Sequence, residues 1–101
     1  MQLNDEDVLR FLRVLCRDEE TVSWAKEAER LGDTFALGAI PTQDDRVAIR
    51  EFVLRLNRWA EEEAAKPQEF DPADYRPGTY RCDKMAGLAE VARAIVQHLA
   101  A

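Results

Sequence analysis

The sequence predicts an all-α fold, and three observations support this prediction. Four segments of the chain repeat their apolar residues at the spacing of one helix face. All four prolines fall outside the interiors of these segments, as expected for a residue that breaks helices. With 101 residues, 47% of them hydrophobic and 34% charged, the chain can bury roughly 60 to 70% of its unfolded surface. We therefore expect a four-helix bundle-like single domain spanning residues 1–101.

The first two helices are expected from about residue 5 to Arg17 and from residue 19 to Gly32. Asn4 and Asp18 precede them and are suitable N-caps, since each side chain can accept a hydrogen bond from an unpaired backbone N–H group. Gly32 suits the left-handed conformation that often follows a helix. Because few residues separate the two segments, we expect them to form a helical hairpin.

The third helix is expected from Thr42 to about residue 66, before Pro67. Thr42 followed by Asp45 resembles a capping box in which Asp replaces the usual Glu. Glu51 and Arg55 lie four residues apart on the polar side and are expected to pair. The apolar side is a continuous stripe made of Ile49, Phe52, Val53, Leu56, Trp59 and Ala60.

The fourth helix is expected from Asp83, or from slightly earlier near Thr79, to the end of the chain. Its apolar residues leave only a narrow polar strip of Glu90, Arg93 and Gln97. A helix that is apolar on nearly all sides is normally surrounded by other helices. We expect it to be the central helix of the fold, and the alternative is that it forms one side of a homodimer interface.

Two ordered irregular segments are expected at about 33–41 and 67–80. The first is compatible with a loop, a helical turn or a short strand, so a minor two-stranded pairing between the segments is an alternative. In the second, Asp71 and Pro72 can start a helical turn, and Pro77 with Gly78 favours a type II turn. We therefore expect this segment to hold one shape.

The segment from Phe70 to Cys82 supplies the candidate partner-binding residues Tyr75, Arg76, Tyr80 and Arg81. Tyrosine and arginine are enriched among the residues that dominate protein interfaces. The alternative is that the aromatic side chains hold the segment down on the helices. Exposure of Tyr75 and Arg76 would distinguish the two.

Charge and cysteine content limit the compartment and the partners. The net charge is −6 and is spread along the chain, which argues against nonspecific nucleic-acid binding. No apolar run is long enough to span a bilayer, and the N-terminal residues are acidic, unlike a secretory signal. We expect a cytoplasmic protein, without membrane association, in which Cys16 and Cys82 are free and buried.

The sequence offers no recognisable catalytic apparatus. His98 is the single histidine, near the end of a helix that is mostly packing surface, and we expect it to be partly exposed or hydrogen-bonded in a structural role. The four glycines form no phosphate-binding motif. We therefore expect no catalytic residues, no cofactor-binding residues and no metal site, although a small enzyme remains the least favoured alternative.

Arg10, Arg13 and Arg17 are spaced to form a basic stripe on the first helix. Such a stripe can contact phosphate or an acidic protein surface. Glu6, four residues before Arg10, and the acids after Arg17 favour a solvated, neutralised face instead. A nucleic-acid-associated regulator that uses this stripe is the second functional hypothesis.

The leading hypothesis is a noncatalytic protein–protein interaction module: a small acidic adaptor, regulator or inhibitor whose partner is another protein. It rests on the missing catalytic residues, the acidic surface and the aromatic and arginine residues of the 67–82 segment. Immunity proteins and phage anti-defence inhibitors also include small acidic helical proteins, and the analogy extends only to size and charge.

Overall fold

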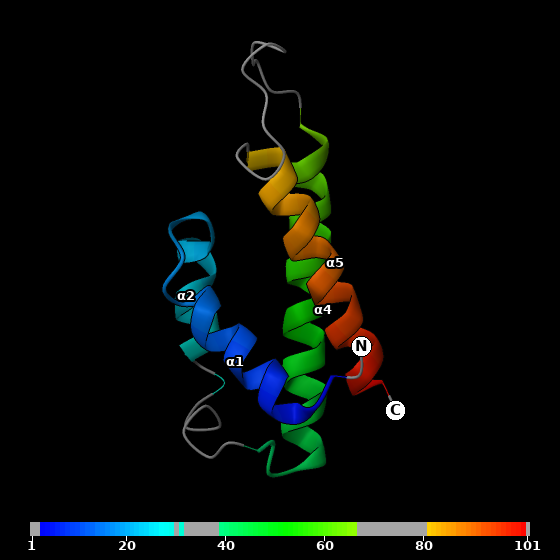
Figure 1. Cartoon of the computed structure of the whole chain (residues 1–101). Helices are drawn as coiled ribbons and strands as arrows, with labels where there is room; N and C mark the ends of the chain where they lie inside the picture. Colours follow the sequence, from blue (N-terminus) through cyan, green and yellow to red (C-terminus); the bar gives the residue numbers. More distant parts are fainter. Residues whose placement is uncertain (1–2, 30, 32–38, 67–80, 101) are drawn as a thin grey trace.

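α-Helices form in all four segments in which the sequence predicts them (Figure 1). The computed structural model describes residues 3–29, 31, 39–66 and 81–100. The helices are α1 (Asp5–Leu15), α2 (Val22–Glu29), α4 (Gln43–Ala65) and α5 (Arg81–Leu99), and the 3₁₀ turn η1 (Glu19–Thr21) precedes α2. No strand occurs within these described ranges, so the predicted all-α fold is confirmed. Residues 33–38 and 67–80, with the alternative of a two-stranded pairing between them, lie outside the description.

The start of α1 is closed by the predicted cap at Asn4. The Asn4 side chain accepts a hydrogen bond from the Asp7 N–H at 2.9 Å, and the Asp7 carboxylate accepts one from the Asn4 N–H at 3.0 Å. The helix ends at Leu15, two residues earlier than expected. The buried Thr21 hydroxyl donates to the Leu15 carbonyl at 2.7 Å. This bond satisfies a carbonyl that the end of the helix leaves unpaired.

The second predicted helix begins as a tighter turn. Asp18 accepts a hydrogen bond from the Glu20 N–H at 2.9 Å, as expected of a cap, but residues 19–21 form η1 before α2 begins at Val22. α1 and α2 pack against each other as the predicted hairpin (Figure 1).

α4 begins and ends where the sequence predicts. The Thr42 hydroxyl accepts from the Asp45 N–H at 3.1 Å and donates to the Asp45 carboxylate at 2.8 Å. At the other end, Lys66 is extended, with ψ of 137°. The following proline disfavours helical backbone in the residue before it, which explains the boundary.

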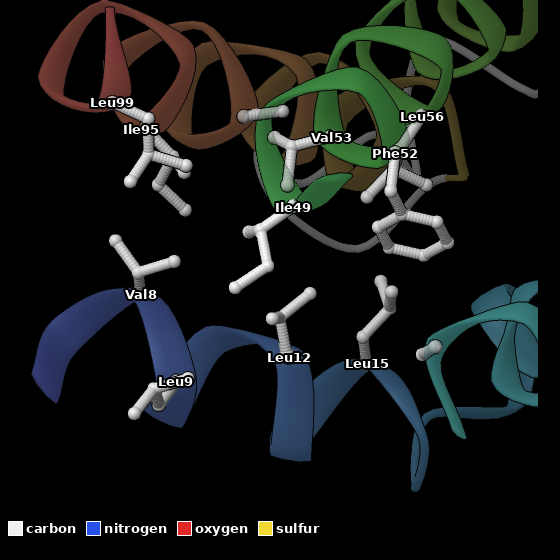
Figure 2. Packing of buried hydrophobic residues seen from close by; sticks show 12 residues of the cluster. Val8, Leu9, Leu12, Leu15, Ile49, Phe52, Val53, Leu56, Ile95 and Leu99 are labelled. Atoms are coloured by element: carbon white, nitrogen blue, oxygen red, sulfur yellow. The ribbon is translucent and has the colours of Figure 1, made fainter. Parts of the chain in front are cut away.

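The apolar core gathers around α4. Buried residues of α1 and α5 face the stripe of α4 in one cluster, together with Ala28 of α2 (Figure 2). Phe52 is 1% exposed, and its ring meets Trp24 of α2 edge-on at 5.7 Å between centroids. Trp24 also contacts Trp59, with 5.8 Å between centroids. The hairpin of α1 and α2 therefore covers one side of α4, and α5 packs antiparallel along another (Figure 1).

The expectation that the last helix is central was wrong. Val91 of α5 is 44% exposed, and Ala86 and Ala94 are exposed as well. α5 buries a single face, made of Met85, Ala89, Ala92, Ile95 and Leu99. Its alanines made the sequence look apolar on all sides, but small side chains do not require burial, and the larger apolar residues of α4 occupy the centre instead.

Two local expectations also differ from the structure. Arg55 pairs with Glu27 of α2 and not with Glu51 of its own helix. α5 begins at Arg81, which agrees with the earlier of the two predicted starts, so Asp83 lies in its first turn and is not its cap. In the first case, a carboxylate on a neighbouring helix provides a partner that sequence spacing does not reveal.

Asn57 is a buried polar residue within the apolar contact between α4 and α5. It is 8% exposed, and its Nδ2 donates to the Ala89 carbonyl of α5 at 2.7 Å. This bond fixes the position of α5 along the axis of α4, because Nδ2 of Asn57 reaches the Ala89 carbonyl at one alignment of the two helices. A buried amide without its partner costs free energy.

Replacing Asn57 by Ala should lower the free energy of unfolding by about 1 to 3 kcal/mol, because the variant loses this hydrogen bond and the packing of the amide. Chemical denaturation followed by circular dichroism measures the change. The neighbouring exposed residue provides the control: Arg58→Ala should stay within about 0.5 kcal/mol of the parent. Equal losses in the two variants would show that the amide bond contributes no stability.

Candidate functional site

The structure places only part of the predicted partner-binding set. Tyr75, Arg76 and Tyr80 lie outside the described residues, so their role stays a prediction. Arg81 is described, as the first residue of α5.

Arg81 is held by contacts within the chain. Its Nε donates to Glu20 of η1 at 3.0 Å, and its Nη1 donates to Glu63 of α4 at 2.5 Å. The guanidinium also lies 5.9 Å from the centroid of the Trp59 ring. Hydrogen bonds from Lys66 and then Arg81 hold the pKa of Glu63 below its ordinary value. Arg81 thereby ties the start of α5 to two other elements, and its role in binding a partner stays a prediction.

The basic stripe is exposed, but its members differ. Arg10 and Arg13 lie on α1, whereas Arg17 lies in the turn after the helix. Arg10 is within 3.6 Å of Glu6 and 4.0 Å of Asp7. These carboxylates lower the local positive potential that would attract phosphate. Nucleic-acid binding through this stripe stays a prediction.

A polar cluster that the sequence did not predict joins three helices. Asp5 of α1 accepts hydrogen bonds on both carboxylate oxygens from Nη1 of Arg46, at 2.9 Å each. His98 of α5 places its Nε2 at 3.0 Å from Asp5 Oδ1. His98 is thus hydrogen-bonded, as expected, but its partner comes from the opposite end of the sequence.

The environment of Asp5 favours its charged form. Burial acts to raise the pKa of this carboxyl, but the hydrogen bonds from His98 and Arg46 outweigh it and hold the pKa below its ordinary 3.8. An ionised carboxylate that is held by a guanidinium is a poor general base, because the proton-bound form is disfavoured. The cluster is therefore best interpreted as a connection among α1, α4 and α5.

The lowered pKa of Asp5 makes a defined prediction for acid unfolding. Because the unfolded chain binds the proton at higher pH than the folded one, the contribution of Asp5 is present above the unfolded pKa. It is lost as the pH falls from about 4 through the folded pKa. Asp5→Asn should cost about 1 kcal/mol at pH 7, and its stability should fall less steeply below pH 4.

Denaturant titrations between pH 2 and pH 7 measure this dependence. Asp44 is an exposed carboxylate in the first turn of α4, and Asp44→Asn is the matched control, which should keep the steep acid dependence of the parent. If Asp5→Asn also keeps it, the interpretation of this cluster is incorrect.

Neither Cys16 nor Cys82 forms a disulfide, and both are of intermediate exposure, not fully buried as expected. Burial raises the pKa of the Cys16 thiol above its ordinary 9.0, nearby Glu29 raises it further, and Arg17 partly opposes them. Since the thiolate is the reactive form, Cys16 has little nucleophilic character at neutral pH.

Cys16 should react slowly with iodoacetamide. In the Cys82→Ser variant, where Cys16 is the remaining thiol, the alkylation rate at pH 8 should be at least about threefold below that of N-acetylcysteine, because both the thiolate fraction and access are reduced. Mass spectrometry of timed samples gives the rate. A rate equal to that of the free thiol would contradict the assignment, and unfolding in urea should restore it.

A further candidate surface is the outward side of α5, which we call the open α5 face: Lys84, Gly87, Glu90, Val91 and Ala94, all exposed. A hollow of about 230 Å³ lies along it, lined by Glu90, Val91 and Ala94 together with Leu3 from the segment before α1. Three of these four lining residues are apolar. The sequence contained a partial signal for this face, since the alternative of a homodimer helix rested on the apolar residues of this helix, which include Val91 and Ala94.

The helices that the structure describes include none long and apolar enough to cross a membrane. Within residues 3–29, 31, 39–66 and 81–100, no group of three or more His, Cys, Asp or Glu residues is arranged to hold a metal ion. In comparisons with known proteins, no family model matches the chain, and neither a curated protein nor a solved structure matches it. The proposed function therefore rests on the geometry of this chain.

Proposed function

We propose that the chain is a noncatalytic protein–protein interaction module, a small acidic adaptor, regulator or inhibitor, and that it meets its partner through the open α5 face. The observation that carries the proposal is the exposed valine of this face beside an apolar hollow. Val91 is 44% exposed, and the hollow of about 230 Å³ adjoins it.

The composition of the face supports this proposal. Protein interfaces combine an apolar centre with a polar rim. Val91 and Ala94 supply the centre, and Lys84 and Glu90 stand beside them on the same helix. Single exposed apolar residues are ordinary, but here an exposed valine, an exposed alanine and the hollow adjoin one another.

The rigidity of α5 is a second support. Its inner face is buried against α4, with Ala92 fully buried and Ile95 1% exposed, and Arg93 pairs with Glu61 of α4 at 2.8 Å. A surface that is already ordered loses little conformational entropy when a partner binds. The face is therefore suited to recognition.

A cytoplasmic location remains part of the proposal. Neither cysteine forms a disulfide, as is usual in a reducing compartment. Cell fractionation with a tagged chain tests the location separately from the interaction.

Affinity capture from a lysate of the native host, with the full chain as bait, tests the interaction. Val91→Glu should reduce recovery of the specific partner at least about tenfold, because a charge at the apolar centre of an interface costs more than 1 kcal/mol. Val22 is another exposed valine, on α2 at 64% exposure, so Val22→Glu makes the same chemical change elsewhere and should recover the partner normally.

The predicted contribution of the 67–82 segment is tested in the same assay. Loss of the partner in Tyr75→Ala or Arg76→Ala, with normal recovery in Val91→Glu, would move the site from α5 to that segment. If all variants recover the same proteins as the parent, neither surface is the interaction site.

A further inference from the structure

The open α5 face contains a glycine that the fold of one chain does not require. Gly87 lies inside α5, where glycine costs about 1 kcal/mol relative to alanine. A Cβ atom at this position would meet no other atom within 4 Å. A glycine on an exposed helix surface is useful where a second helix crosses, because the distance between helix axes depends on the side chains at the contact.

Residues of opposite charge lie three positions before and three positions after this glycine in the sequence. Lys84 precedes Gly87 by three residues, and Glu90 follows it by three. Both side chains are exposed, and neither has an ion-pair partner among the described residues. By contrast, Arg81 and Arg93 at the two sides of this region are paired within the chain.

Building on the proposed function, we propose that the partner on the open α5 face is a second copy of this chain, whose α5 crosses the first antiparallel with Gly87 against Gly87. In a two-fold contact each residue meets the same counterpart in both directions. Lys84 of each copy then faces Glu90 of the other, which makes two equivalent ion pairs. A parallel arrangement would place Lys84 against Lys84, so the charges select the antiparallel one.

Two apolar residues lie beside the crossing. Val91 and Ala94 are exposed on the same side of α5 as Gly87, so a second helix that crosses at Gly87 can remove part of their apolar surface from water. A contact made by one helix face falls below the roughly 1,200 Å² of standard protein interfaces. We therefore expect a reversible dimer with a dissociation constant in the micromolar range.

Sedimentation equilibrium of the full chain, from about 5 to 500 μM, tests the proposal over the range expected for a small interface. The mass should rise with concentration from 11.5 kDa toward twice that value. Lys84→Glu alone and Glu90→Lys alone should each weaken association about tenfold, because like charges then face each other at both ends of the crossing. The double variant K84E/E90K should recover the parent affinity, since the pairs re-form with their signs exchanged.

Control variants separate this effect from net charge and from folding. Lys26→Glu on α2 and Glu62→Lys on α4 make the same charge changes at exposed positions away from the face, and both should dimerise like the parent. Gly87→Gln should fold normally, because its position is open. It should weaken association at least tenfold, because the longer side chain increases the distance between the two crossing helices. Circular dichroism of each variant confirms that the helices are intact.

A monomer at every concentration, or a dimer that is insensitive to the charge exchange, would overturn the second copy as the partner. If the chain is monomeric but Val91→Glu still abolishes capture of a different protein, the interaction function stands without self-association. If capture and mass are both insensitive to changes on this face, the proposed function falls as well.

Discussion

Burial of the apolar stripe of α4 is the constraint on which the rest of the structure depends. Phe52, Val53 and Leu56 are almost fully buried, and they can be buried only if other helices cover them from more than one side. The hairpin of α1 and α2 supplies one cover and α5 supplies the other (Figures 1 and 2). At roughly 1.5 to 3 kcal/mol for each large apolar side chain removed from water, this cluster is the main source of stability in the described core.

Polar clusters at opposite ends of the α4–α5 pair set the alignment of the helices. At one end, Asp5 joins the start of α4 to the end of α5 through Arg46 and His98. At the other end, Arg81 joins the start of α5 to Glu63 near the end of α4. Between them, Asn57 reaches the Ala89 carbonyl. Apolar contacts are non-directional, so these directional bonds select one alignment among those that bury similar area.

The alanine content of α5 links the core to the candidate site. On the inner side, Ala89 and Ala92 are buried against α4, where small side chains permit close packing. On the outer side, Ala86 and Ala94 are exposed at little cost. One helix can therefore complete the core and still present an outer surface of mostly small side chains, on which Val91 is the largest apolar residue.

The sequence by itself determined the features that depend on near neighbours along the chain. The capping groups at Asn4, Asp18 and Thr42, and the end of α4 before Pro67, follow from interactions over a few residues. The positions of the helices and of their buried stripes follow from the spacing of apolar residues along one helix face, which is a property of each helix by itself. These are local effects, so the sequence predicts the ends of the helices to within about three residues.

Only the tertiary structure decided which helix is central and which charges pair. Arg55 pairs with Glu27 of a neighbouring helix and not with Glu51, and Asp5 contacts a histidine 93 residues away. Packing between helices brings these groups together, and their separation along the chain does not reveal how close they lie in space. The candidate site shows the same division. The apolar character of the last helix is evident from its composition, but which of its sides is open depends on where α4 lies, and that is decided by the packing of the whole core.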